Sequence, residues 1–308
     1  MRATLVAVIG LALLLGGKPA GALRHPAAPE CPVFPASNPW NQRVDRLPVA
    51  ANSEAIIRAI GSNETLHPDF GSGRWEGAPI GIPITVVRGR QPKVPVRFEY
   101  ADESDPGPYP IPRGVAIEGG RQSDGDRHAL ILDRDNCRLY ELFALYPTRT
   151  AWRAGSGAIW NLRSNRLRPA GWTSADAAGL PILPGLARYD EVARGRIDHA
   201  LRFTVRRSRR AYVYPARHFA SSATDPDLPP MGLRVRLKAS FPTSGYPRQA
   251  RIVLEALKRY GMIVADNGSD WFISGAPDRR WSNEQLRTLR RVPGSAFEVV
   301  ATSRLEPR

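Results

Sequence analysis

Several sequence signatures of common enzymes are missing from this chain of 308 residues. It has no G-x-S-x-G nucleophile elbow, no H-E-x-x-H metal motif, no P-loop and no glycine pattern of a dinucleotide-binding fold. The nearest serine motif, Ala154–Gly157, reads A-G-S-G, and its glycines lie directly beside Ser156. That spacing indicates a tight turn rather than a nucleophile. No single motif therefore identifies a reaction.

Cysteine is scarce, because only Cys31 and Cys137 occur. Two cysteines are too few for a zinc cluster or for a disulfide scaffold. In an oxidising compartment two cysteines most simply pair. We therefore predict one disulfide, Cys31–Cys137, which would close a loop of about 105 residues. Two free buried thiols are the alternative.

Long apolar runs are also scarce, and the longest one lies at the N-terminus. Met1-Arg2 is a short positive start, Ala3–Leu15 is almost entirely apolar, and Ala20–Ala22 offers a small-residue cleavage site. This order is typical of a secretory signal peptide. A membrane anchor is the alternative, but a spanning helix needs about 20 apolar residues. We predict a signal peptide over residues 1–22 and a secreted or periplasmic protein without a transmembrane segment.

Acidic residues are fewer than basic ones. The chain has 29 Asp and Glu and 44 Lys and Arg, which gives a formal charge of +15. A basic exported protein can meet an acidic polysaccharide, an anionic envelope or nucleic acid. The arginines are spread over many segments, and the run Arg206–Arg210 has the pattern of a solvated hairpin turn between Ile197–Val205 and Ala211–Pro215. Nucleic acid is therefore not an expected partner.

Proline and glycine recur through the chain, with 29 and 27 residues, and this spacing favours short strands joined by turns. The predicted strands are Ile80–Val87, Val94–Tyr100, a hairpin of His128–Asp133 with Cys137–Tyr146, the Arg206–Arg210 hairpin, Leu233–Ala239, and a hairpin of Met262–Ala265 with Asp270–Ser274 around Asn267-Gly268. The sequence thus predicts a mainly β chain.

Helical periodicity is limited to a few segments. Ser53–Ile60 and Pro247–Tyr260 carry it, and Ser282 opens a short helix in which Gln285 is placed to complete a capping box. We expect residues 23–48 to be an irregular N-terminal segment. Residues 49–308 are expected to form a single β-rich domain, a β-sandwich or jelly roll with a few packed helices.

Three histidines of the strand-rich middle are candidates for chemistry. His128 and His199 each begin a predicted strand on its apolar face, within the matching sequences D-R-H-A-L and I-D-H-A-L. If the two strands are neighbours, both imidazoles meet at one rim of the sheet, and His218 follows closely enough to join them. Such a group can bind a metal or share a proton. The alternative is hydrogen-bonded histidines at strand ends.

Carboxylates are the second resource. Glu141 lies within a strand, where an acid is unusual, although an outward-facing position is the alternative. Asp176 follows a polar, aromatic stretch that begins at Trp160 and has the character of a site-bearing loop. Glycoside hydrolysis needs two carboxylates at a defined separation, which a sequence does not measure. Further acids flank or lie in the first hairpin (Asp124, Asp126, Asp133 and Asp135), lie downstream of it (Asp190, Glu191 and Asp198) or flank the Asn267-Gly268 turn (Asp266 and Asp270).

Aromatic and basic side chains complete the candidate site. Trp160 and Trp271 stand beside polar residues, and such rings offer flat apolar surfaces to sugars. Core packing is the alternative for each ring. Arg202 lies close in sequence to His199 and is a candidate for neutralising an acidic sugar. The sequence does not identify a metal or a cofactor.

Three stretches resemble a family of secreted bacterial proteins. They are Arg168–Leu186 (RPAGWTSADAAGLPILPGL), Gly195–Phe203 (GRIDHALRF) and Tyr260–Gly268 (YGMIVADNG). The similarity covers residues 31–300, nearly the whole exported part. The resemblance implies export and one continuous domain. The family has no settled activity, so the resemblance supplies no catalytic residues.

We therefore predict a secreted carbohydrate-active enzyme that degrades a polysaccharide as a hydrolase or a lyase, with an extracellular polysaccharide or envelope glycan as its partner. The candidate catalytic residues are His128, Glu141, Asp176, His199 and His218, and the candidate substrate contacts are Trp160, Arg202 and Trp271. A hydrolase would use two carboxylates, whereas a lyase would use a base and an arginine. The alternative is a non-catalytic exported protein that binds a glycan or the envelope.

Overall fold

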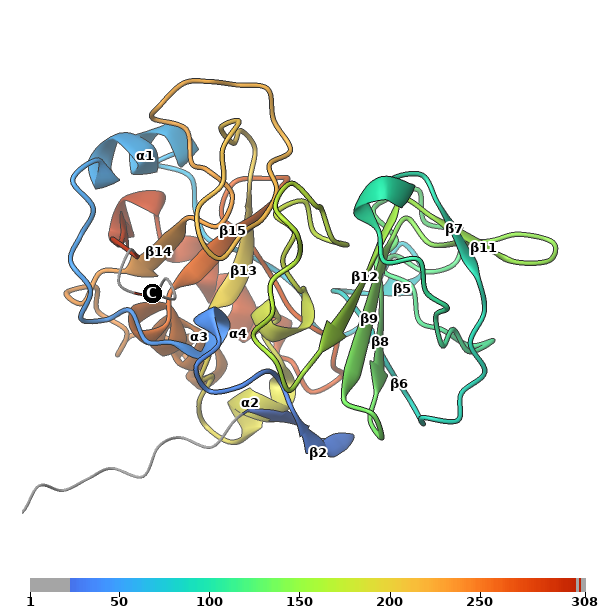
Figure 1. Cartoon of the computed structure of the whole chain (residues 1–308). Coiled ribbons are helices and arrows are strands. Elements are labelled where there is room, and N and C mark those ends of the chain that lie inside the picture. The colour runs from blue at the N-terminus through green and yellow to red at the C-terminus, as the bar shows by residue number, and fades with distance from the viewer. Residues whose placement is uncertain (1–22, 303–304, 306–308) are drawn as a thin grey trace, which may run out of the picture.

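The computed structural model of the protein describes residues 23–302 and Leu305. The predicted signal peptide, residues 1–22, lies outside the described residues. Strands hold more of the described chain than helices do, so the prediction of a mainly β chain with few helices is confirmed. Figure 1 shows two groups of elements side by side, which we name the central lobe and the C-terminal lobe.

The central lobe is built on a four-stranded sheet in the order β12-β9-β8-β6. Its strands are β6 (Ile84–Val87), β8 (Ala129–Asp133), β9 (Arg138–Phe143) and β12 (Ser156–Asn161). Strands β8 and β9 form the predicted antiparallel hairpin. Leu130 and Leu132 of β8 join one apolar cluster, and Ala129 and Ile131 join another. Because both faces are covered, the residues Ala129–Leu132 of β8 are all apolar rather than alternating with polar ones.

Smaller sheets complete the central lobe and its border. One has the order β10-β11-β7, and another pairs β4 with β5. Their strands are β7 (Val96–Phe98), β10 (Tyr146–Pro147), β11 (Trp152–Ala154), β4 (Arg74–Trp75) and β5 (Ala78–Pro79). The short 3₁₀ helix η2 (Ala101–Glu103) follows β7 and carries Glu103 to the edge of the lobe.

The C-terminal lobe contains a six-stranded mixed sheet in the order β17-β14-β15-β13-β16-β3. Its strands are β3 (His67–Asp69), β13 (Leu201–Val205), β14 (Arg234–Leu237), β15 (Met262–Asn267), β16 (Phe272–Ser274) and β17 (Phe297–Val299). Strand β13 runs parallel to β15 and antiparallel to β16. It therefore lies between the two strands that flank Asn267-Gly268.

This order corrects two predicted hairpins. Strands β15 and β16 do not pair with each other, because the apolar β13 takes the place between them. Residues Ala211–Pro215 form no strand with β13 and make only an isolated bridge from Tyr212 to Met231. Burial of β13 in the centre of the sheet outweighs the local turn preferences on which both predictions rested.

Helices cover the sheet of the C-terminal lobe. They are α1 (Ser53–Ile60), α2 (Tyr189–Ala193), α3 (Arg248–Arg259) and α4 (Asn283–Arg287), with 3₁₀ turns η1 (Pro39–Asn41), η3 (Leu183–Gly185), η4 (Thr288–Arg291) and η5 (Gly294–Ala296). Ser282 Oγ accepts the backbone N–H of Gln285 and caps α4 as predicted. The capping box does not close, because Gln285 Oε1 accepts the N–H of Gln249 instead.

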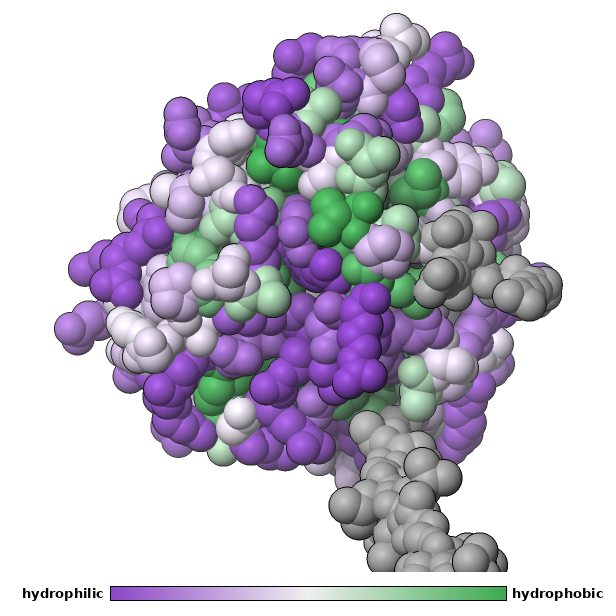
Figure 2. Space-filling view, turned by 90° about the vertical axis from the view of Figure 1, so that its left-hand side faces the viewer, coloured by the Kyte–Doolittle hydropathy of each residue, from purple (hydrophilic) through white to green (hydrophobic). Residues whose placement is uncertain are grey.

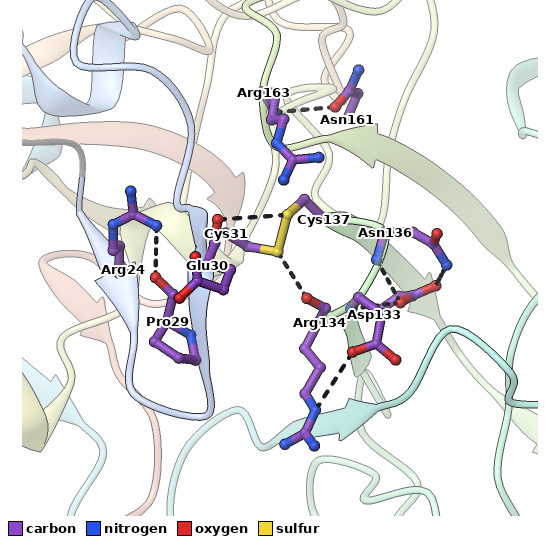
Figure 3. Close-up of a disulfide and its surroundings, with 11 residues drawn as sticks. Arg24, Pro29, Glu30, Cys31, Asp133, Arg134, Asn136, Cys137, Asn161 and Arg163 are labelled. Carbon is purple, nitrogen blue, oxygen red and sulfur yellow. Dashed lines mark hydrogen bonds and ion pairs between the residues drawn. A yellow bond between two sulfur atoms is a disulfide. The ribbon is translucent and has the colours of Figure 1, made fainter.

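The N-terminal segment that was predicted to be irregular contains a small hairpin of β1 (Arg24–His25) with β2 (Ala28–Pro32). The predicted Cys31–Cys137 disulfide is confirmed and ties β2 to the turn before β9, with 5.1 Å between the Cα atoms (Figure 3). Further along, the buried Arg234 of β14 donates to the carbonyl of Pro39. The segment is thus anchored to both lobes.

The largest apolar cluster lies in the C-terminal lobe, around β13, β15 and α3.

The face seen in Figure 2 is mostly hydrophilic, with small separate apolar patches. Over residues 23–302, no helix has both the length and the apolar character needed to cross a membrane.

Candidate active site between the lobes

A cleft of about 370 Å³ is lined by residues of both lobes. Tyr100, Glu103 and Asp126 reach it from the central lobe, and His218 and Asp266 reach it from the C-terminal lobe. The Tyr100 ring is 46% exposed, which is high for an aromatic side chain. The cleft therefore combines carboxylates, an imidazole and an accessible aromatic face.

Asp266 lies at the end of β15 and opens into this cleft. Its Oδ1 accepts the N–H of Asn267 at 2.7 Å, and its Oδ2 accepts the N–H of Ala177 at 3.4 Å. Burial, together with the charge of Asp176 and a hydrogen bond to it, raises the pKa of Asp266 to about 8, although Arg202 opposes the shift. This upward shift favours the protonated form of Asp266, which is the form that a general acid requires.

Asp176 and Arg202 form a buried ion pair behind Asp266. Arg202 Nη2 and Nε donate to the two carboxylate oxygens of Asp176 at 2.5 and 2.9 Å. Arg202 Nη1 donates to Ser274 Oγ at 2.5 Å. This two-point contact holds Asp176 as the negative neighbour of Asp266. Because Arg202 is buried and already bonded, its predicted role as a substrate contact is corrected: it positions Asp176.

His218 lies in the cleft. Its Nδ1 donates to the carbonyl of Ala177 at 2.8 Å, and its Nε2 is 3.7 Å from Glu103 Oε2 across the cleft. The same Glu103 oxygen accepts the N–H of Thr173 at 3.0 Å. The structure therefore sets a carboxylate of the central lobe opposite an imidazole and an acid of the C-terminal lobe.

His128 is buried directly behind the wall of the cleft. Its Nε2 donates to the carbonyl of Ala175 at 2.9 Å, and its Nδ1 is 2.5 Å from Glu118 Oε2. Burial lowers the pKa of His128, but the charge and hydrogen bond of Glu118 outweigh it and raise the pKa to about 9. The exposed Asp126 carboxylate stands beside this pair and lines the cleft.

His199 lies elsewhere, so the expected meeting of three imidazoles is wrong. Its Nδ1 donates to the carbonyl of Ala200, and its Nε2 is 3.0 Å from Glu191 Oε2. The reason is topological, because His128 precedes β8 of the central sheet and His199 precedes β13 of the C-terminal sheet. The fully buried His199 anchors α2 rather than facing a cleft.

Glu141 and Trp160 bind each other inside the molecule. The Glu141 carboxylate accepts the N–H groups of Ile182 and Leu183 and the Trp160 Nε1–H, at 2.9–3.0 Å. Burial raises the pKa of Glu141 to about 7, although these hydrogen bonds oppose it. Both side chains are buried, and neither lines the cleft between the lobes. Their predicted catalytic and sugar-binding roles are corrected to that of anchors.

Trp271 is fully buried, and its predicted contact with substrate is corrected as well. Its ring lies between Phe203 and Phe297, with ring centroids 5.8 and 5.0 Å away, and its Nε1 donates to the carbonyl of Gly61. No ring face remains for a sugar. The exposed indole is Trp75 on the β4–β5 hairpin, which is 71% exposed.

Trp75 borders a second cleft of about 630 Å³, which Asp69, Glu118 and Arg290 also line. Partial desolvation and the charges of Glu118 and Asp126 raise the pKa of Asp69. Glu118 thus lines the second cleft while Asp126 lines the first. The Glu118–His128 pair lies where the two clefts approach each other.

No protein-family model, curated protein or solved structure matches the chain. The suspected family stays a prediction, and the site is argued from its geometry. Asp266 has a signal in the sequence, because it directly follows the apolar strand Met262–Ala265 and flanks the Asn267-Gly268 turn. Glu103, Glu118 and Tyr100 had none, since long-range contacts bring them to the clefts.

Proposed function

We propose that the protein is an exported hydrolase that cleaves a polysaccharide in the cleft between the lobes. The observation that carries this proposal is the Asp266 carboxyl, which opens into the cleft beside the ion-paired Asp176 and has a pKa raised to about 8. A carboxylic acid that keeps its proton at neutral pH can protonate the leaving oxygen of a glycosidic bond.

Glu103 is the proposed second carboxylate. The Thr173 N–H holds one of its oxygens, and His218 lies 3.7 Å from the same oxygen. Glu103 would activate water or attack the sugar directly, depending on its separation from the acid. Lyase chemistry has less support, because Arg202 is bonded to Asp176 at two points and is not free to neutralise a uronate.

The proposed substrate class rests on the surroundings of the acids. The exposed face of Tyr100 suits stacking against a sugar ring, and the net charge of +15 suits an acidic polysaccharide. The N-terminal signal pattern and the disulfide support action outside the cytoplasm. The sheets of the central lobe enclose an apolar cluster, and this supports a sandwich-like arrangement within that lobe.

The test is incubation of the protein with a panel of polysaccharides, read by reducing ends and by the absorbance of unsaturated products. We expect reducing ends without unsaturated products. Asp266→Asn should lower the rate by about 10²-fold or more. The matched control is Asp270→Asn. Asp270 lies between β15 and β16 in the chain, its carboxylate accepts the N–H of Arg206, and it does not line the cleft. Equal rates for wild type and Asp266→Asn would refute the proposed acid.

A non-catalytic glycan-binding protein is the second candidate. The highly exposed Trp75 beside the second cleft favours it, because binding proteins present such rings to sugars. Binding of a polysaccharide by the wild type with no release of product from any member of the panel would favour this alternative.

A further inference from the structure

Three side chains near the meeting point of the two clefts form a group suited to a cation. An oxygen of Glu118, an oxygen of Asp126 and a ring nitrogen of His128 all lie within 4.8 Å of one another. We infer that these three residues bind a divalent cation of the zinc or manganese type. Imidazole and carboxylate groups are ligands that both ions accept, and three protein ligands leave positions open for water.

The hydrogen bonding of His128 orients it as a ligand. Its Nε2–H donates to the carbonyl of Ala175 at 2.9 Å, so Nδ1 is the nitrogen that a cation would bind, in place of the proton that Nδ1 shares with Glu118. That nitrogen faces Glu118 Oε2 at 2.5 Å. A metal-binding histidine typically donates its other N–H to a carbonyl or carboxylate, as His128 does. The ring is buried, so packing holds this orientation.

A cation can reach the group without unfolding of the chain. The Asp126 side chain is exposed at the first cleft, and Glu118 is 25% exposed and lines the second cleft. The buried His128 closes the group from the inside. The two carboxylates therefore present oxygens to solvent while the imidazole supplies a fixed inner ligand.

The local charge is consistent with a cation at this place. The negative charges of Glu118 and Asp126 raise the pKa of Asp69. The surroundings are thus locally negative, although the whole chain carries a formal charge of +15. Arg202, the arginine that interacts with Glu118 through space, is bonded to Asp176 at two points and lies behind the cleft. Once a cation replaces the proton on His128, the carboxylates of Asp69, Glu118 and Asp126 lie close enough to offset its charge.

The first experiment measures binding rather than activity, so it is independent of the proposed hydrolysis. The protein is dialysed against EDTA, freed of chelator and titrated with Zn²⁺ and with Mn²⁺ in a calorimeter. We expect one equivalent to bind. Asp126→Asn should weaken binding by about 10- to 100-fold. The matched control is Asp124→Asn, which removes an exposed acid of the same loop and should bind as the wild type does.

The second experiment identifies the ligand nitrogen. Electron spin-echo envelope modulation of the Mn²⁺ complex should show coupling to an imidazole nitrogen, and His128→Gln should abolish that coupling. Absence of binding at millimolar Zn²⁺ and Mn²⁺ would overturn the inference, as would equal affinities for wild type and Asp126→Asn. A fully bound Mn²⁺ without nitrogen coupling in the wild type would also overturn it. If His128→Gln does not fold, the inference is still tested by the wild-type spectrum and by the calorimetric comparison of Asp126→Asn with Asp124→Asn.

Discussion

Replacement of Asp266 by Asn should stabilise the folded protein at neutral pH while it removes the proposed acid. Asparagine has nearly the same shape, and its Oδ1 can accept the N–H of Asn267 as Asp266 Oδ1 does at 2.7 Å. Its amide can donate to Asp176, as the protonated carboxyl does. The variant therefore keeps the hydrogen bonds of the protonated acid without the need to hold a proton.

The magnitude follows from the pKa of Asp266, which is 3.8 for the ordinary side chain and about 8 in the folded protein. Because the folded state binds the proton more tightly, this carboxyl lowers stability progressively as pH rises from about 4 to about 8. Each pKa unit corresponds to about 1.4 kcal/mol, so the upper limit at pH 7 is about 4 kcal/mol. Asp266 is 23% exposed, and screening by water reduces the expected stabilisation to about 1–3 kcal/mol.

The assay is urea unfolding of wild type and Asp266→Asn at several pH values between about 4 and 8. The difference in the free energy of unfolding should be near zero at the acidic end and should grow toward neutral pH. The exposed Asp124→Asn is the control and should show no such trend. A difference that is independent of pH, or an Asp266→Asn variant less stable than wild type at pH 7, would refute the reasoning.

Three further predictions concern stability and binding. Replacing Cys31 and Cys137 with Ala removes a link between residues 106 apart and should lower the free energy of unfolding by about 2–5 kcal/mol in urea titrations; an unchanged midpoint would contradict this. Trp75→Ala should weaken polysaccharide binding by about 1 kcal/mol, about fivefold in a calorimetric titration, with an unchanged melting temperature. Glu141→Ala leaves buried N–H donors unpaired and should cost about 3 kcal/mol or more in unfolding free energy, whereas a loss under about 1 kcal/mol would rule out the anchor role.

The features that the sequence predicted well depend on neighbours in the chain. Helix α1 occupies the predicted Ser53–Ile60, because the apolar spacing and the following Gly61 act within two turns. The N-cap Ser282 and the β8–β9 hairpin are local in the same sense. The disulfide was predictable for a different reason, since two cysteines allow only one intramolecular pair.

The features that the sequence did not predict depend on contacts between distant segments. Nothing near Asn267-Gly268 shows that β13 separates β15 from β16. Nothing near Trp271 distinguishes a ring packed between Phe203 and Phe297 from an exposed one. Hydropathy and spacing describe which side chains prefer burial, whereas the choice among several tryptophans is made by the packing of the whole lobe.

The polar candidates divide according to the hydrogen-bonding capacity that the fold leaves unused. Glu141 accepts from three N–H donors and Asp176 is held at two points by Arg202, so both are saturated from within the protein. Asp266 keeps a proton, and the Asp126 carboxylate stands exposed, so both face a cleft with capacity to spare. Buried saturated groups fix a structure, whereas partly solvated groups with unused capacity can act on a ligand. By that criterion the cleft between the lobes is the place for the chemistry that we propose, and the buried Asp176, which Arg202 holds behind it, contributes to the raised pKa of Asp266.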